Sequence, residues 1–209
     1  MIKKLKMNKT VLQTIKSLSP DSISKDRRIA LQPLIDYIQN KLAADQPIRL
    51  NFICTHNSRR SHLSQIWAQT MAYHFNIKNV FCYSGGTEAT AMFPKVAETL
   101  RNQGFEIQLL STHENPVYAM KYAQNEVPVI CFSKEYSNDF NPQNEFGAIM
   151  TCNNADEGCP LVLGAEARFP IKYDDPKVSD NTPEQTKVYA ERSLEIATEM
   201  FYVFSQVKK

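Results

Sequence analysis

The feature that most constrains the fold is a strand-like segment followed by a short polar loop and a helix-like segment, over residues 48–75. Residues 48–53 are mostly apolar and read as a strand. After the loop, large apolar residues recur at helical spacing and form one stripe, which comprises Leu63, Ile66, Trp67 and Met71. The loop therefore lies between the end of a strand and the start of a helix that packs on a sheet.

The same alternation of strand and helix continues along the chain. Residues 80–84 read as a second strand, and residues 94–103 read as a helix that ends at Gly104. Segments that alternate in this way predict an α/β fold with a parallel, doubly wound sheet. Further strands are expected at residues 105–110, 127–132, 146–151 and 171–173. The last two of these end next to Cys152 and Asp174.

Two helices are expected before this unit, at residues 10–18 and 24–43. Pro33 either kinks the second helix or starts it anew. We therefore predict an N-terminal helical extension, residues 1–46, and a main domain, residues 47–209. The extension is expected to pack its apolar face on the main domain or on a second subunit.

The last helix is predicted to begin with a capping box, because Thr182, Pro183 and Gln185 precede its apolar face. We expect this helix to close one side of the sheet. Residues 134–145 are rich in Asn, Asp, Ser and Pro and are predicted to form a loop.

The charge and composition argue against several classes of function. A net charge of +2 gives no broad basic field, so nucleic acid is not implied as a partner. No apolar segment approaches membrane-spanning length, and the basic N-terminus lacks the apolar core of a signal peptide, so we expect a cytoplasmic protein without membrane contact. The 5 cysteines are an odd number in a reducing compartment, which favours free thiols over a disulfide framework.

A cysteine and an arginine lie at the two ends of the loop that follows the first strand. Cys54 ends the strand, and Arg60 follows after 5 intervening residues, where the helix begins. Backbone N–H groups at a helix N-terminus bind anions, and the same positive field lowers the pKa of a thiol. The planar guanidinium of Arg60 matches two oxygens of a phosphate-like ligand. We therefore predict an oxyanion site in which Cys54 is the nucleophile.

The other loop residues fit this role, although the pattern alone is not specific. Ser58 and Ser61 can donate hydrogen bonds to the thiolate or steady the loop, and Asn57 suits a positive φ. The alternative is that Cys54 is a small buried hydrophobe and Arg60 an ordinary first residue of a helix. The strand before the loop and the amphipathic helix after it favour the functional interpretation.

A second pair of cysteines, Cys152 and Cys159, follows the strand expected at residues 146–151. In one continuous helix, seven residues would separate the two Cα atoms by about 10 Å, beyond the limit of roughly 7 Å for a disulfide. A bond between them therefore requires a loop or unwinding, which Gly158 and Pro160 favour. The alternatives are two inert thiols or half of a metal site, but the spacing differs from that of a zinc knuckle and predicts no metal. We favour a redox role.

The third candidate is the turn Asp174-Asp175-Pro176, which follows the last expected strand. A carboxyl group held there can protonate a leaving oxygen. The same turn is also common in surface loops, so alone it does not indicate catalysis. Cys82 and Cys131 lie in apolar strand segments and are expected to be core thiols.

These segments together resemble the thioredoxin-coupled arsenate reductases, which share a fold with the low-molecular-weight protein tyrosine phosphatases. The resemblance covers residues 48–206. Its motifs, in the order of the family, are residues 54–61, residues 84–89 with Pro94 and Gly104, residues 152–160 and residues 174–176. The resemblance implies an α/β fold with a four-stranded, parallel, doubly wound sheet. The first and last motifs are shared with the phosphatases, and the paired cysteines favour the reductase.

The resemblance also implies a role for each matching residue. Cys54 would attack arsenate held by Arg60 and the other loop residues, with Asp175 as the general acid. Cys152 would then attack Cys54 and release arsenite, and Cys159 would resolve that disulfide and leave a Cys152–Cys159 bond for thioredoxin to reduce. The oxyanion loop comprises Thr55, His56, Asn57, Ser58, Arg59, Arg60 and Ser61. No cofactor is implied, and the expected partners are arsenate or phosphate and thioredoxin.

The sequence departs from the family pattern in three places. His56 stands where the family usually has glycine, so the loop must accommodate a side chain, for which a left-handed conformation is one solution. Arg59 stands where a second loop cysteine is usual and adds a charge near the site. The extension and residues 127–145 have no counterpart, and we expect them to cover the site or form a subunit contact.

Two other functions fit the same residues. In a phosphatase that hydrolyses phosphoesters through a Cys54 phosphoenzyme, Cys152 and Cys159 would only protect Cys54 from oxidation. In an oxyanion-binding or redox-sensing interaction protein, nothing would be turned over and the helices of the extension would carry the signal. The cysteine pair makes arsenate reduction our leading prediction.

Overall fold

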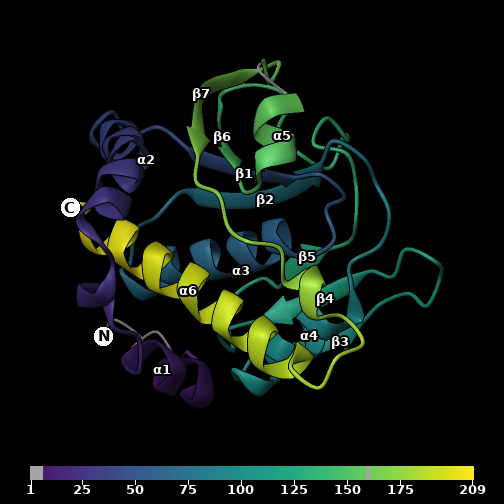
Figure 1. Ribbon diagram of the computed structural model, residues 1–209. Coiled ribbons are helices and arrows are strands. Elements are labelled where there is room, and N and C mark those ends of the chain that lie inside the picture. The colour runs from purple at the N-terminus through teal and green to yellow at the C-terminus, as the bar shows by residue number, and fades with distance from the viewer. Residues whose placement is uncertain (1–6, 159–160) are drawn as a thin grey trace.

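Figure 1 shows the computed structural model, which describes residues 7–158 and 161–209. The predicted resolving cysteine, Cys159, lies outside the described residues. The described chain contains two sheets with helices around them. Within it, no helix is both long and apolar enough to cross a membrane.

The larger sheet contains four parallel strands in the order β2-β1-β6-β7. The strands are β1 (Ile48–Cys54), β2 (Val80–Gly86), β6 (Phe146–Met150) and β7 (Ala165–Pro170). Together with the flanking helices, this confirms the predicted α/β fold with a four-stranded, doubly wound sheet. Because all four strands run in the same direction, the segments that follow them meet at one edge of the sheet.

Helices cover the sheet on both sides. In Figure 1, α3 (Arg60–His74), α4 (Pro94–Asn102) and α6 (Gln185–Ser205) lie together below the sheet, and the short α5 (Asn153–Gly158) lies beside β6 at the other side. The helices predicted after the first two strands are therefore confirmed. So is the expectation that the last helix closes one side of the sheet.

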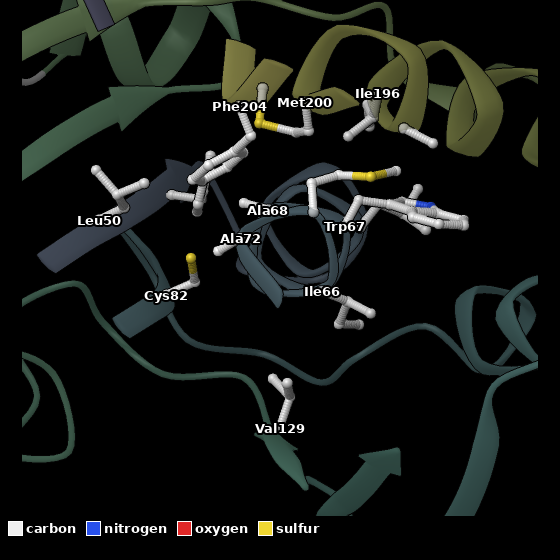
Figure 2. Packing of buried hydrophobic residues seen from close by; sticks show 14 of the residues in the cluster. Leu50, Ile66, Trp67, Ala68, Ala72, Cys82, Val129, Ile196, Met200 and Phe204 are labelled. Atoms are coloured by element: carbon white, nitrogen blue, oxygen red, sulfur yellow. The ribbon is translucent and has the colours of Figure 1, made fainter. Parts of the chain in front are cut away.

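The core is built mainly on the side of α3 and α6. Leu50 of β1 belongs to the large core cluster, whereas Ile53, three positions on, belongs to a smaller cluster on the side of α5. Figure 2 shows Leu50 with Trp67 of α3 and Phe204 of α6 in the large cluster. Packing on both faces fixes β1, and with it the loop that follows this strand.

The N-terminal extension forms α1 (Lys9–Lys16) and α2 (Lys25–Ala43), and both pack against the main core. Its buried apolar side chains are Val11, Ile15, Leu31, Leu34, Ile35 and Ile38. The extension therefore packs its apolar residues on the main domain, which was one of the two expected outcomes. The boundary between residues 46 and 47 stays a prediction.

Pro33 lies inside α2 and does not divide it into two helices. A proline in a helix interior leaves the carbonyl four residues earlier without its usual partner. Here that carbonyl belongs to Ile29, whose side chain is 62% exposed, so this side of α2 faces water. Water can therefore satisfy the carbonyl, and the helix continues.

The smaller sheet is antiparallel and contains β3 (Glu106–Leu109), β4 (Tyr118–Lys121) and β5 (Val129–Cys131), in that order. The strands expected at residues 105–110 and 127–132 therefore exist but do not join the parallel sheet. Three of the four residues of β3 are exposed, which suits a small surface sheet rather than a central strand. β4 was not among the expected strands, although its residues are mostly apolar and buried.

Two predictions near the C-terminus are wrong. Residues 171–173 do not form a strand, because the fourth strand, β7, already ends at Pro170. As an edge strand, β7 is only partly buried, so its sequence lacks a continuous apolar run. Thr182 does not cap α6, because its hydroxyl donates to the carbonyl of Ser179 at 2.8 Å and the N-cap residue is Glu184. The loop predicted at residues 134–145 is confirmed.

β2 is an edge strand, yet several of its outer backbone groups are hydrogen-bonded. Gln69 of α3 donates to the carbonyl of Val80 at 3.0 Å and accepts from the N–H of Cys82 at 2.9 Å. Gln65, one turn earlier, donates to the carbonyl of Cys82 at 3.0 Å. At its C-terminal end, β2 bonds instead to the backbone of the 134–145 loop. This loop is thereby fixed beside the end of β2, where Gly86 pairs with Cys54 at the end of β1.

Candidate active site

The predicted oxyanion loop connects β1 to α3, between Cys54 and Arg60. The loop turns at Asn57, whose φ of 43° is left-handed. His56 does not have a positive φ, so the left-handed conformation considered for this residue is wrong. Asn57 adopts it at little cost, because a short polar side chain tolerates this conformation better than most.

Close backbone contacts fasten the loop to the segment after β2. The N–H of Glu88 donates to the carbonyl of Thr55 at 2.9 Å. Gly86 leaves no room for a side chain, because a Cβ atom there would lie 2.6 Å from the carbonyl oxygen of Thr55 and 2.8 Å from the N–H of Asn57. A glycine is therefore required where the two segments cross.

Cys54 lies at the base of this loop and is 4% exposed. Its Sγ is 3.1 Å from Oγ of Ser61, and the same Oγ accepts a hydrogen bond of 2.8 Å from Nδ2 of Asn57. Because Asn57 donates to Ser61, the hydroxyl proton of Ser61 is available to the sulfur. A hydrogen bond of this kind stabilises negative charge on Sγ and so suits a nucleophilic thiolate.

Arg60 connects the loop to the predicted acid turn. Its Nη2 is 2.5 Å from Oδ2 of Asp175, and its Nη1 donates to the carbonyl of Tyr173 at 3.0 Å. The buried Nε of Arg60 has no hydrogen-bond partner in the part of the chain that the structure describes. A buried donor without a partner is costly unless a ligand satisfies it. The guanidinium therefore keeps at least one donor for an oxyanion.

Cys152 follows β6 and faces the same loop. Its Sγ lies 3.5 Å from Oγ1 of Thr55 and accepts from the N–H of Ala155 at 3.4 Å. Cys152 is 2% exposed and belongs with Cys54 to the smaller core cluster. The structure thus brings Cys54, Arg60, Cys152 and Asp175 to one region, while Cys159 lies outside the described residues.

The remaining loop residues make contacts with different neighbouring segments. Ser58 is buried, and its carbonyl accepts from the N–H of Phe93 at 3.0 Å. The side chain of His56 is 45% exposed and lies 3.5 Å from a carboxylate oxygen of Glu88. The side chain of Arg59 lies against α6, where its Nε donates to the hydroxyl of Tyr189 at 2.6 Å.

Ser133 and Lys134 support the loop from the segment 127–145, which has no counterpart in the family. We call this segment the insertion. The sequence gives no sign of this role. The hydroxyl of Ser133 donates to the carbonyl of His56 at 2.9 Å, and the N–H of Lys134 donates to Oδ1 of Asn57 at 3.0 Å. The insertion therefore supports the loop through these two hydrogen bonds. No spacing rule could have indicated this, because the partners are 77 positions apart. The expectation that the insertion covers the site or forms a subunit contact stays a prediction.

Two buried basic residues lie behind the loop. Lys134 is 2% exposed, and burial lowers its pKa to about 8, an effect that the nearby thiol of Cys131 partly opposes. Burial and the charge of Lys134 lower the pKa of His62 to about 3, and its Nδ1 lies 3.2 Å from Oγ of Ser84. His62 is therefore neutral at pH 7. In the described chain, His, Cys, Asp and Glu side chains do not form a cluster of three or more that could hold a metal.

The chain was compared with family models, with curated proteins and with solved structures. No family model matches the chain. A curated protein of Staphylococcus haemolyticus, described as arsenate reductase 2, is 27% identical over 127 residues, which cover 60% of this chain and 76% of the relative.

Solved structures show a likeness of fold at lower identity. A mutant of YwlE from Bacillus subtilis superposes with a TM-score of 0.50 and 13% identity, covering 78% of this chain and 99% of that chain. A low-molecular-weight phosphotyrosine phosphatase of Vibrio cholerae O395 gives a TM-score of 0.49 and 13% identity, covering 76% and 94%.

Proposed function

Because the chain is related to the arsenate reductases and has the low-molecular-weight phosphatase fold, we propose that it reduces arsenate to arsenite through a relay of cysteines. The observation that carries the proposal is the position of Cys152 beside the anion loop. Its Sγ lies 3.5 Å from Oγ1 of Thr55, the residue that follows Cys54. A second thiol at this place takes no part in the hydrolysis step itself, whereas a reductase requires it.

In the first step, the Cys54 thiolate attacks the arsenic of arsenate and a sulfur–arsenic bond forms. One arsenate oxygen leaves as water, with a proton supplied by Asp175. The hydrogen bond from Ser61 and the free donor of Arg60 support this step, because the first stabilises the thiolate and the second meets the oxyanion.

In the second step, the Cys152 thiolate attacks Sγ of Cys54. A disulfide forms, the electron pair of the sulfur–arsenic bond stays on arsenic, and arsenic is reduced from As(V) to As(III) and leaves as arsenite. Cys159 then attacks Cys152 and frees Cys54. The remaining Cys152–Cys159 disulfide is reduced by a dithiol protein, for which thioredoxin in a reducing cytoplasm is the proposed partner.

This relay requires α5 to change shape. The 6 residues of α5 occupy the positions between Cys152 and Cys159. A continuous helix would hold the two Cα atoms about 10 Å apart, whereas a disulfide needs less than about 7 Å. A helix this short has few internal hydrogen bonds to lose, so partial unwinding is accessible.

Phosphoester hydrolysis is the second candidate function, and one specific observation favours it. The contacts among Cys54, Ser61, Arg60 and Asp175 do not involve Cys152. A nucleophile, an oxyanion-binding arginine and an acid suffice to form and hydrolyse a phosphoenzyme. Hydrolysis of phosphoesters therefore needs no part of the relay.

The deciding experiment measures arsenate-dependent oxidation of reduced thioredoxin by wild type and by Cys54→Ser, Cys152→Ser and Cys159→Ser. We expect no turnover in any of the three variants. Cys159→Ser should release one arsenite per enzyme and retain a Cys54–Cys152 disulfide. Cys82→Ala is a matched control, because burial raises the pKa of that thiol and it should take no part.

Each outcome separates the candidates. Full turnover by Cys152→Ser would exclude the relay. Hydrolysis of phenyl phosphate that is lost in Cys54→Ser and retained in Cys152→Ser would support the phosphatase chemistry. Failure of both reactions, with arsenate still bound, would support an oxyanion-binding protein without turnover.

A further inference from the structure

We propose that Arg59 is a positioning residue that keeps Asp175 over the anion loop while Arg60 turns to the oxyanion. This inference rests on the proposed function, because it has meaning only if Asp175 protonates a leaving group. It concerns one of the three places at which the sequence departs from the pattern of the family that it resembles, with an arginine in place of the usual second cysteine.

Two consecutive arginines hold the two ends of the acid segment. The 3-10 helix η2 (Pro176–Ser179) has Asp175 at its N-cap and Asp180 at its C-cap. Arg60 holds the first carboxylate, with Nη2 and Oδ2 2.5 Å apart, and Arg59 holds the second at the same Nη2–Oδ2 distance. The segment that carries the predicted acid is therefore tied twice to the start of α3.

The two arginines differ in what else they must bind. Arg60 is the predicted oxyanion ligand, and within the described chain its Nε is free to meet the oxyanion. A guanidinium that binds two oxygens side by side uses Nε and Nη2 together, and Nη2 is the group that holds Asp175. The guanidinium of Arg59 is already engaged, because its Nε donates to the hydroxyl of Tyr189 at 2.6 Å and its central carbon lies 4.1 Å from the ring centre of Phe93. When an oxyanion displaces Asp175 from Arg60, the ion pair between Arg59 and Asp180 remains.

The surroundings of Asp180 favour its ion pair with Arg59. Its Oδ1 accepts from the hydroxyl of Tyr189 at 2.6 Å and from Nε2 of Gln185 at 3.1 Å. Burial alone would raise its pKa, but these two hydrogen bonds and the charge of Arg59 hold the pKa of Asp180 below its ordinary value. The carboxylate therefore stays charged at neutral pH. The Arg59 and Asp180 side chains are only 11% and 14% exposed, so water screens the pair less than a surface pair.

Internal hydrogen bonds make η2 able to transmit this restraint. The hydroxyl of Ser179 donates to the carbonyl of Pro176 at 2.8 Å, and the N–H of Lys177 donates to Oδ1 of Asp175 at 3.1 Å. Fixing the C-terminal end of η2 therefore also fixes the carboxyl group at its N-terminal end. Without Arg59, Asp175 would keep its chemistry but lose its place over the loop.

The first test compares leaving groups. Phenyl phosphate releases a poor leaving group, with a pKa of about 10 like that of tyrosine, and depends strongly on a general acid; p-nitrophenyl phosphate depends on it much less. Arg59→Met should lower kcat/KM for phenyl phosphate by about tenfold to a hundredfold, within the range of general acid catalysis, and change kcat/KM for p-nitrophenyl phosphate far less. Asp180→Asn should behave in the same way.

Two controls separate positioning from general stability. Lys41→Met removes an ion pair of 2.6 Å with Glu166, and the side chain of Lys41 is 12% exposed, as buried as that of Arg59. This variant should leave the ratio of the kcat/KM values for the two substrates unchanged. In an Asp175→Asn background, Arg59→Met should not change the ratio further, because the acid that it positions is absent.

The second test needs no turnover. Hydrogen exchange of the backbone amides of η2 is followed with and without inorganic phosphate. In wild type, phosphate should leave this segment protected, because Arg59 still holds Asp180. In Arg59→Met, phosphate should accelerate exchange in the same segment, because neither the Arg60–Asp175 pair nor the Arg59–Asp180 pair is then present.

The outcomes distinguish this inference from the proposed function. A wild-type protein that binds phosphate and hydrolyses both esters, with Arg59→Met indistinguishable from Lys41→Met, would overturn the inference alone. A wild-type protein that binds neither phosphate nor arsenate would overturn the proposed function and the inference with it. A selective loss of phenyl phosphate hydrolysis together with phosphate-induced exchange in η2 would support the inference.

Discussion

The backbone N–H of Lys134 donates a hydrogen bond to Oδ1 of Asn57 at 3.0 Å, so the inserted segment holds the one left-handed residue of the anion loop. The side chain of the same lysine is buried, and its Nζ lies 4.4 Å and 5.3 Å from the ring centres of Phe132 and Phe140. A buried ammonium group and the shape of the anion site are therefore coupled through one residue.

We predict that Lys134 makes stability depend on pH in the alkaline range. Burial lowers its folded-state pKa to about 8, below the unfolded value of about 10.4, so the unfolded state binds more protons between these values. Stability should therefore rise with pH in this window. Relative to Lys134→Met, wild type should gain about 3 kcal/mol between pH 8 and pH 10.5 in urea unfolding. A constant difference between the two proteins would contradict the prediction.

His62 should have an effect of the same sign on the acid side, because its pKa is also lowered in the folded protein. Its pKa in the folded protein is about 3, below the unfolded value of about 6.5, so the unfolded state takes up the proton first as the pH falls. Stability is full above pH 6.5 and is lost below it. Between pH 6.5 and 4.5, wild type should lose about 2 kcal/mol relative to His62→Gln, measured by the same unfolding method. Parallel curves for the two proteins would contradict the prediction, because they would show that His62 has the same pKa in the folded and the unfolded state.

Gly86→Ala should impair oxyanion binding. Its Cβ would lie 2.2 Å from the carbonyl oxygen of Glu88 and 2.6 Å from that of Thr55, and neither backbone can yield without moving the loop. We expect the affinity for inorganic phosphate to fall by at least about tenfold, or 1.4 kcal/mol, in titration calorimetry. Gly158→Ala is the control, since a Cβ atom there meets nothing within 4 Å. Equal affinity in the two variants would show that the loop tolerates the displacement.

Arg27→Met should destabilise the fold from the N-terminal extension. Arg27 of α2 forms hydrogen bonds of 2.6 Å and 2.8 Å with Glu199 and one of 3.1 Å with the carbonyl of Lys172, next to the acid turn. The Glu199 side chain is 5% exposed, so the variant leaves a buried charge without its partner. The expected loss is roughly 3 kcal/mol in thermal or urea unfolding.

The double variant provides the check on this mechanism. Glu199→Gln in the Arg27→Met background removes the unpaired charge and should recover part of the lost stability. If the double variant is as unstable as the sum of both single variants, the two side chains do not act as a pair.

The parallel sheet could be predicted from the sequence because its central strands are buried on both faces. Such strands contain runs of apolar residues that stand out between polar loops, as in β1 and β6. β7 does not, because it lies at an edge and is only partly buried. β2 lies at the other edge but is largely buried, and it could be predicted. Within the parallel sheet, the sequence therefore identifies the buried strands and misplaces the exposed one. In the smaller sheet, the buried central strand β4 was not predicted.

The part of the candidate site that lies within one stretch of sequence could also be predicted. The position of Cys54 and Arg60 between a strand and a helix follows from residues adjacent in sequence. The contacts of Arg59 with Asp180 and of Asn57 with Lys134 join positions 121 and 77 residues apart, which no local pattern records. Nor does composition predict a buried Lys134, since lysine side chains are almost always exposed.

The glutamines that bond to β2 have a consequence for how molecules of this protein meet in solution. An edge strand with open N–H and C=O groups offers a template on which a strand of another chain can add. On β2, the groups of Val80 and Cys82 already bond to Gln69 and Gln65, so an incoming strand would first have to displace them. The protein thus resists aggregation by strand addition at this edge through amide side chains, without placing a proline or a lysine in the strand.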